Sequence, residues 1–200
     1  MTKLLLGLFS NTWNPIWDLK EKNFANESVS HKHVGSVLSR LWEKEFQSGS
    51  EFELAVFQDT LSDPIDFYPT TYRRFMQIGI HLHDKIRNMF ELGFEKGYEK
   101  VIFVDPILIF HSTNIPETIQ NNWKEDSVLL MPDSQGKIAL CGMEEEHFWQ
   151  FENFEFQAKE AIVEILSDCN SKNISFQLLN SFELEQVEAK MKEAFQTNLY

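Results

Sequence analysis

The amino-acid sequence predicts an α/β fold with a mostly parallel central sheet flanked by helices. Short, continuously apolar runs are typical of strands that are buried on both faces, and the segments between them carry apolar residues at helical spacing. The chain has 200 residues, of which 42% are apolar and 14% aromatic, and this is enough for one core. We therefore expect a single domain over residues 1–200.

The apolar runs that we expect to be strands are rich in Val, Ile, Leu and Phe, and polar or turn residues end them. In chain order they are residues 4–9, 52–57, 101–104, 127–131, 137–143 and 174–179. Segments that place apolar side chains three or four positions apart predict helices. In chain order these are residues 29–46, 80–94, 115–123, 157–166 and 183–195. Gly97 suits the end of the second helix, and Asn114 suits the N-cap of the third.

The charge of the chain argues against one class of partner. Asp and Glu number 31 against 18 Lys and Arg, which gives a formal net charge of −13. Because DNA, RNA and anionic membranes are bound by basic surfaces, we expect no nucleic-acid or membrane partner. A local cationic pocket for a single phosphate is compatible with this balance. Glycine occurs only 8 times, although loops that bind phosphate commonly use it.

The sequence favours a reduced, cytoplasmic protein. Cys141 and Cys169 are too few for a disulfide framework and lack a Cys-x-x-Cys spacing. The apolar run at residues 4–9 ends in polar residues without a small-residue cleavage pattern, so we expect a strand there and no signal peptide. No apolar run approaches the roughly 20 residues that a transmembrane helix needs.

Ligands of open parallel sheets bind beyond the carboxyl ends of the strands. The segments expected at that edge are residues 10–18, 58–66, 105–113 and 132–136. Asp105 directly follows a buried strand, where a carboxylate can hold a divalent cation that bridges a diphosphate. The alternative is that Asp105 caps the turn at Pro106, since Ile107 and Leu108 stand where a second carboxylate would be expected.

The other sequence patterns give weaker evidence for a functional site. The residues of the pairs His31/His33 and His81/His83 lie two positions apart and do not face each other on a helix, so we interpret them as surface or helix-start residues rather than zinc ligands. The sequence has no Gly-x-Ser-x-Gly, Walker-type or Gly-x-Gly-x-x-Gly motif, so hydrolase, P-loop and Rossmann dinucleotide signatures are absent.

Aromatic residues gather in two places. Trp13 and Trp17 lie in the first loop after a strand, where they could stack on a base or sugar or fill an empty site. A second group follows the acidic residues 144–146 and consists of Phe148, Trp149, Phe151, Phe154 and Phe156. For this group we favour packing in the core or a subunit interface over a lid or acceptor platform, because aromatics are enriched in both.

Three segments resemble the motifs of one family in the same order and at fitting intervals. Residues 77–86 align without gaps with Gln-x-Gly-x-Asp-Leu-Gly-Glu-Arg-Met, and Gln77 and Gly79 match. Gly97 and residues 101–105 resemble a glycine, a strand and the loop Gly-Thr-Asp-Ser-Pro-Asp-Leu. Residues 132–143 align with Pro-Ala-x-Asp-Gly-Gly-Tyr-Tyr-Leu-Leu-Gly-Leu. These motifs belong to bacterial glycosyltransferase-like proteins of the nucleotide-diphospho-sugar transferase (GT-A) type, also known as radical-SAM/selenodomain-associated transferases.

The resemblance implies a GT-A-like sandwich and a donor site for a nucleotide-sugar or nucleotide at the carboxyl edge of the sheet. Asp105 would be a ligand of Mg²⁺ or Mn²⁺, or a carboxylate on the ribose side. Gln77 and Gly79 would form a turn that faces the nucleotide, and Lys85 would be a cation on the phosphate side. Gln135 and Gly136 would complete the edge.

The sequence departs from the family where the chemistry would be. Residues 13–21 replace a loop with glycine and two cations, and they place Ile16 at the glycine position and add Asp18 and Glu21. Leu108 replaces the family's second strand-end Asp, and Gln135 replaces the Asp of the last loop. Cations that could compensate are Lys20, Lys85 and Lys137.

Two functional interpretations stay open. In the first, the protein is a divergent glycosyltransferase-like member that binds a nucleotide-sugar or nucleotide through weakened metal and phosphate motifs, with its activity undecided. In the second, it is a catalytically silent protein that uses its acidic surface and the aromatic residues 148–156 to bind a partner or itself as a homo-oligomer. A loop of residues 13–21 folded over the strand ends would favour the second interpretation.

Overall fold

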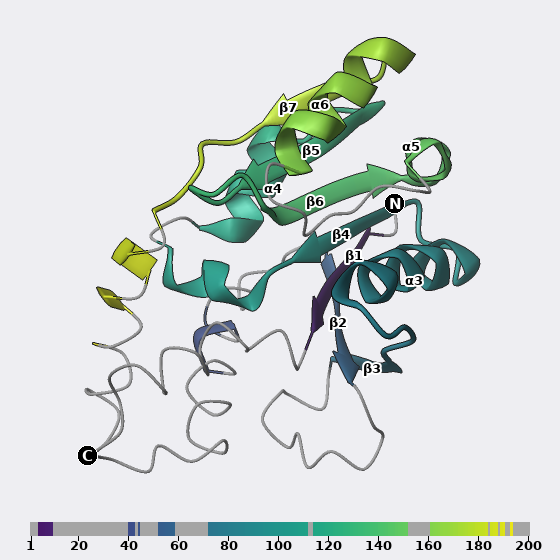
Figure 1. Ribbon diagram of the computed structural model, residues 1–200. Coiled ribbons are helices and arrows are strands. Elements are labelled where there is room, and N and C mark those ends of the chain that lie inside the picture. The colour runs from purple at the N-terminus through teal and green to yellow at the C-terminus, as the bar shows by residue number, and fades with distance from the viewer. Residues whose placement is uncertain are drawn as a thin grey trace.

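A seven-stranded sheet organises the chain, with the strand order β3-β2-β1-β4-β6-β5-β7 (Figure 1). The computed structural model describes residues 4–9, 40–42, 44, 52–58, 72–111, 114–151, 161–183, 185–187, 189, 190 and 193. The strands are β1 Leu4–Phe9, β2 Phe52–Gln58, β3 Arg73–Met76, β4 Lys100–Val104, β5 Ser127–Pro132, β6 Ile138–Glu144 and β7 Ser175–Leu178. The helices are α3 Leu82–Glu95, the 3₁₀ helix η1 Pro106–Phe110, α4 Ile115–Asn122, α5 Glu145–Gln150 and α6 Ala161–Lys172.

One strand runs against the others. The pairs β1–β2, β1–β4, β2–β3 and β5–β7 are parallel, whereas β6 is antiparallel to both of its neighbours, β4 and β5. We call the side of the sheet where the parallel strands end the carboxyl edge, and the side where they begin the amino edge. At the carboxyl edge, β4 ends at Val104 and β5 ends at Pro132, and at the amino edge, β5 begins at Ser127 and β6 ends at Glu144.

Both faces of the sheet are buried, as the continuously apolar runs predict. Successive residues of β4 alternate between two cores: Ile102 and Val104 belong to one, and Val101 and Phe103 to the other. The first core includes apolar residues of η1 and α4, and the second includes those of α3, α5 and α6. Figure 1 shows α3 beside β1 and β4, and α6 beside β5 and β7. The predicted mostly parallel α/β fold is confirmed.

The structure adds elements that the apolar pattern did not predict. The edge strand β3 has exposed Arg73 and Arg74 and so lacks an apolar run, while η1 and α5 are short. Helix α6 extends to Lys172, beyond the predicted end at residue 166. It stops before Asn173, whose φ of 57° lies in the left-handed region that ends many helices.

Parts of several predicted elements lie outside the described residues. Of the helix expected over residues 29–46, residues 40–42 and 44 are described, and they are helical. Of the one expected over residues 183–195, residues 185–187, 189, 190 and 193 are helical. Among the described residues, no helix is long and apolar enough to cross a membrane. A single domain over residues 1–200 stays a prediction.

Gly93 marks the closest approach of α3 to the sheet. A Cβ atom added at Gly93 would lie 2.6 Å from Val101 Cγ2 and 3.2 Å from Leu5 Cδ2. In a helix interior, Gly→Ala ordinarily stabilises by roughly 0.5–1 kcal/mol, but here the added methyl group has no space. Contact between helix and sheet therefore requires glycine at this position.

We predict that Gly93→Ala lowers the free energy of unfolding by about 1–3 kcal/mol, because overpacking forces the helix away from β1 and β4. Urea unfolding followed by circular dichroism measures the change. Glu95→Ala, an exposed position of the same helix, is the matched control and should be neutral within about 0.5 kcal/mol. Equal stability of the Gly93→Ala variant and the original protein would contradict the packing argument.

Candidate functional site

Asp105 occupies the carboxyl edge at the end of β4. Its backbone N–H donates to Ala139 O at 2.7 Å, which continues the pairing with β6. Its side chain is the N-cap of η1, because Oδ1 accepts a hydrogen bond from the Ile107 N–H at 3.0 Å. The capping interpretation of Asp105 is thus confirmed. The other carboxylate oxygen, Oδ2, has no hydrogen-bond partner among the described residues.

The surroundings of Asp105 change the pKa of its carboxyl group. Desolvation by burial raises the pKa of Asp105 to about 6, against an ordinary value of 3.8. The Ile107 N–H lowers this pKa, the nearby Asp133 carboxylate raises it, and the Lys137 ammonium lowers it. The carboxyl edge thus brings together two carboxylates and a cation from distant positions in the sequence.

Asp133 directly follows β5 and is buried, with 8% of its surface exposed. Its Oδ1 accepts hydrogen bonds from the Gln135 N–H at 2.8 Å and the Lys137 N–H at 2.9 Å. These bonds close the turn between β5 and β6, so the two carboxylates Asp105 and Asp133 flank the start of β6. Asp133 is a second carboxylate at this edge, and it comes from another strand, whereas Leu108 stands at the position where the family has its second Asp.

Gln135 and Gly136 shape this turn. Gln135 is exposed and contributes its backbone N–H to Asp133. Gly136 has a φ of +79°, which favours glycine, and its carbonyl accepts a hydrogen bond from the Ile162 N–H of α6 at 3.1 Å. Both residues therefore lie beside Asp133, and their contact with a ligand stays a prediction.

Gln77, Gly79 and Lys85 lie in the segment that follows β3 and opens α3. Strand β3 is three strand spacings from β4 in the sheet order, which is roughly 14 Å. The structure therefore brings these three residues together with one another but not into contact with Asp105. Lys85 is half-buried in the first turn of α3.

The side chain of Gln77 makes a hydrogen bond inside the protein. It is buried, its Nε2 donates to Phe57 O at 2.7 Å, and its backbone N–H donates to Gln58 O at 2.6 Å. Gly79 has a φ of +129°, and a Cβ atom there would lie 2.6 Å from the Asp84 Cβ. A nucleotide-facing role for this turn would thus use its backbone rather than the Gln77 side chain.

The histidines of this segment belong to the start of α3, as predicted. His81 is the N-cap, and its backbone N–H donates to Asp84 Oδ2 at 3.0 Å. The His81 and His83 rings stack with centroids 5.7 Å apart. This backbone hydrogen bond, together with the charges of the histidines, lowers the pKa of Asp84 despite an opposing desolvation effect.

His111 is a titratable residue of the carboxyl edge that the sequence patterns did not single out. It follows η1, and its ring lies 5.4 Å from that of Phe182, whose carbonyl accepts the Ser134 N–H beside Asp133. Desolvation and the Lys190 charge lower the pKa of His111, which favours the neutral imidazole. A small apolar hollow beside it, lined in part by Leu108 and Met131, has no room for a water molecule.

Several predicted functional residues lie outside the described part of the chain. They are Trp13, Trp17, Lys20, His31, His33, Phe154 and Phe156, and the loop of residues 13–21 is among them. Of the aromatic cluster, Phe148 and Phe151 are buried in the core, and the Phe148 ring lies 5.4 Å from that of Phe90. The packing interpretation is therefore confirmed for these two residues, whereas Trp149 is 48% exposed.

A second group of metal-ligating side chains lies at the amino edge. Asp126, Glu146 and His147 each offer a ligand atom within 4.8 Å of the others. Asp126 precedes β5 and the other two belong to α5, so this group lies at the opposite end of β5 and β6 from Asp133.

We predict that Asp105→Asn makes the metal-free protein more stable at pH 8, by up to about 3 kcal/mol, with a difference that shrinks toward pH 4. Below pH 4 the carboxyl group is protonated in both the folded and the unfolded chain. Between pH 4 and 6 the folded state binds more protons, so the original protein loses this contribution as the pH rises. The substituted amide would keep the hydrogen bond from the Ile107 N–H without the charge.

Urea unfolding of both proteins in EDTA at pH 4.5, 6 and 8 measures this difference. Glu125→Gln, an exposed position, is the control and should leave the pH profile unchanged. If the stability difference between the Asp105→Asn variant and the original protein does not depend on pH, the pKa of Asp105 is not raised in the folded protein.

Comparison with known proteins shows the fold alone. No protein-family model matches the sequence, and no curated protein matches it. A candidate nucleotide-diphospho-sugar transferase from Desulfovibrio desulfuricans has a similar structure with a TM-score of 0.71 and 10% identity, over 97% of this chain and 99% of that one. The 4-diphosphocytidyl-2C-methyl-D-erythritol synthase from Anaerococcus prevotii has a TM-score of 0.59 and 8% identity, over 98% of both chains. A cytidylyltransferase from Leptospira borgpetersenii has a TM-score of 0.50 and 12% identity, over 91% of this chain and 75% of that one. The chain thus has a nucleotide-diphospho-sugar transferase-like fold.

Proposed function

We propose that the protein is a divergent bacterial, cytoplasmic glycosyltransferase-like protein of the GT-A type. In this proposal a nucleotide-sugar or nucleotide binds at the carboxyl edge of the sheet, and a divalent cation binds beside Asp105 and Asp133. The observation that carries the proposal is the convergence of these two carboxylates and Lys137 at the strand ends where ligands of open sheets bind. The structural likeness to nucleotide-sugar and cytidylyl transferases supports it.

The donor atoms at this edge fit Mg²⁺ or Mn²⁺, which prefer carboxylate oxygens. Asp105 and Asp133 each use Oδ1 to accept backbone N–H groups. In this proposal the Oδ2 atoms of both carboxylates are the ligands of the ion. When bound, such an ion would neutralise charge on a leaving diphosphate.

Lys137 is the cation proposed to hold the donor phosphates next to this ion. Its ammonium is close enough to Asp105 to lower the pKa of that carboxyl group. The transfer itself needs the leaving diphosphate to be held while an acceptor is oriented for in-line attack on the sugar carbon. His111 lies at the same edge, and in this proposal its imidazole, whose lowered pKa favours the neutral form, accepts the proton of an acceptor hydroxyl.

The turn at Gln77 and Gly79 is proposed to bind the nucleotide end of the donor, with Lys85 on the phosphate side. These residues lie roughly 14 Å from β4, so a ligand that reaches both places must extend across the ends of β2 and β1. An extended nucleotide-sugar suits this distance better than a free phosphate or a small sugar.

The alternative function is a catalytically silent protein that binds a partner or itself. The burial of Phe148 and Phe151 removes these two side chains from any docking surface. The alternative therefore depends on the acidic surface, on the exposed Trp149 and on the residues beyond Phe151. It differs from the proposed function in one measurable respect, since it requires no nucleotide binding.

We predict that at least one nucleotide-sugar or nucleotide raises the melting temperature in the presence of Mn²⁺ or Mg²⁺. A ligand at a hundred times its Kd stabilises by about 2.7 kcal/mol, which corresponds to roughly 5–10 °C for a chain of this size. A thermal-shift screen of nucleotide-sugars and free nucleotides, with each metal and with EDTA, measures the effect. The absence of any shift in all conditions would refute donor binding and favour the silent alternative.

We further predict that Asp105→Asn and Asp133→Asn each abolish the metal-dependent part of this shift. Both substitutions keep an oxygen that accepts the backbone N–H groups and remove the charge that attracts the cation. Glu125→Gln is the matched control and should respond like the original protein. If both Asp variants retain the full metal-dependent shift, the two carboxylates are not the metal ligands.

A further inference from the structure

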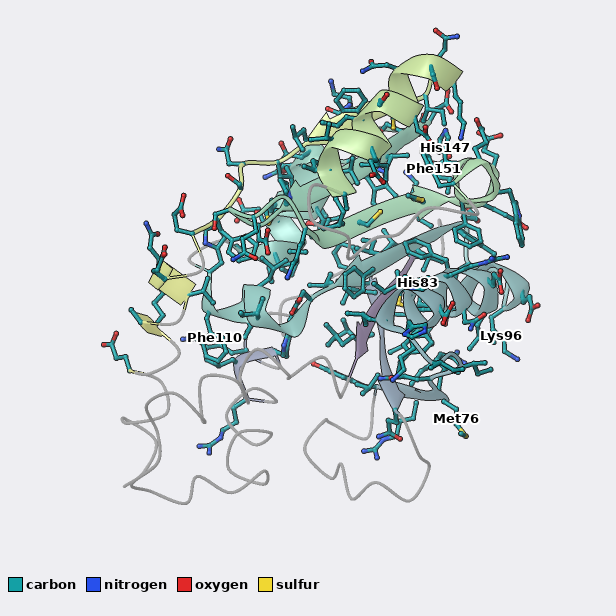
Figure 2. All side chains as sticks on the ribbon, in the orientation of Figure 1. Met76, His83, Lys96, Phe110, His147 and Phe151 are labelled. Carbon is teal, nitrogen blue, oxygen red and sulfur yellow. The ribbon has the colours of Figure 1, made fainter. Side chains whose placement is uncertain are left out.

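The amino edge of the sheet carries a group of side chains with no part in the proposed donor site. Asp126 immediately precedes β5, and Glu146 and His147 lie in α5, which follows β6. Because β5 and β6 are antiparallel, the start of one meets the end of the other at this edge. Figure 2 shows His147 at the α5 end of the molecule, while Phe110 of η1 lies at the other end.

His147 is the inner member of this group. Its side chain is only 5% exposed, and its Nε2 lies 3.2 Å from Asp126 Oδ1, whose side chain is 80% exposed. The imidazole is therefore buried, and its Nε2 contacts a carboxylate that is exposed at the protein surface. The next residue, Phe148, packs against Phe90 and Phe94 with ring centroids 5.4 and 5.6 Å apart, which holds α5 against the core.

Only one of the two imidazole nitrogens of His147 has a polar partner within the described residues. Its Nδ1 is buried and has no hydrogen-bond partner among the described residues, although buried polar atoms are ordinarily paired. Nε2 lies beside the Asp126 carboxylate, and Asp126, Glu146 and His147 each offer one ligand atom within 4.8 Å of the other two. Asp126 and Glu146 are exposed and repel each other unless a positive charge lies between them.

The chemistry of these three donors favours one class of ion. One imidazole nitrogen and two carboxylate oxygens are ligands that Zn²⁺ accepts, and three protein ligands leave a fourth tetrahedral position for water. The two carboxylates also balance the charge of a divalent ion. Mg²⁺ prefers oxygen ligands alone and is the poorer match for a site with an imidazole.

We propose that Asp126, Glu146 and His147 bind a Zn²⁺-class transition-metal ion that joins the start of β5 to α5. The site is separate from the proposed donor site, because Asp126 and Asp133 lie at opposite ends of β5, roughly 20 Å apart at 3.3 Å per residue. A metal here would stabilise the amino edge and would not require a nucleotide. The proposal therefore stands or falls independently of the proposed function.

Isothermal titration of the EDTA-treated full chain with Zn²⁺ tests the site. We expect one Zn²⁺ per chain, no binding of Mg²⁺ by these residues, and a Zn²⁺-dependent rise of the melting temperature. Glu146→Gln and Asp126→Asn change exposed side chains, so both variants should fold, and each should weaken Zn²⁺ binding by roughly tenfold to a hundredfold or more. His147→Gln changes a buried residue and is not needed for the conclusion.

Two matched controls identify the ion's position. Glu145→Gln changes the neighbouring exposed carboxylate of α5, and Glu125→Gln changes the exposed carboxylate next to Asp126, so neither should alter Zn²⁺ affinity. Long-range ¹H–¹⁵N spectra should show the His147 Nε2 resonance shift on Zn²⁺ addition, and the Glu146→Gln variant should need a correspondingly higher Zn²⁺ concentration for the same shift. Equal Zn²⁺ affinity of the original protein and both ligand variants, or no Zn²⁺ binding at all, would overturn the proposal and leave only a contact between His147 and Asp126.

Discussion

The reversal of β6 between β4 and β5 places the candidate ligand residues at both edges of the sheet. Because β6 is antiparallel to both neighbours, the turn that leads into it, residues 133–137, lies next to the end of β4. This turn brings Asp133 and Lys137 to Asp105. The same reversal returns the chain to the amino edge, where Glu146 and His147 of α5 meet Asp126 at the start of β5. A parallel β6 would have required a long crossover and would have joined neither pair.

The carboxyl edge combines structural and chemical constraints in the same side chains. Asp105 and Asp133 each use one carboxylate oxygen to accept hydrogen bonds from backbone N–H groups. Such bonds are needed because the backbone N–H groups that follow a buried strand have no partner in the sheet. Burial makes the charged form of Asp105 costly, so this edge holds a carboxyl group with a pKa of about 6. A bound cation would offset that cost. A carboxyl group with a strongly raised pKa at a strand end is typical of functional sites, and it is consistent with the proposed cation site.

The sequence predicted the elements with strong patterns and missed those whose form depends on neighbours. Buried strands such as β1, β4 and β5 stand out as continuous apolar runs, because both of their faces are covered. The edge strand β3 has Arg73 and Arg74 exposed and is a strand because β2 pairs with it. Among the site residues, Asp105 was predicted from its place after an apolar run. Asp133 follows residues 127–132 in the same way, but the family motif that this loop resembles places its acidic residue at the position of Gln135.

The sequence by itself determined the α/β class, the parallel character of the sheet and the position of Asp105 at a strand end. These properties depend on local patterns, since the period of apolar residues and the turn that ends a strand are readable within a few neighbouring positions. Only the tertiary structure decided which polar residues meet. The nearness of Asp133 to Asp105, the use of the Gln77 side chain inside the sheet, and the grouping of Asp126 with His147 all depend on strand order and direction. Strand order is set by packing and pairing between distant segments, and no local pattern in a single sequence records it.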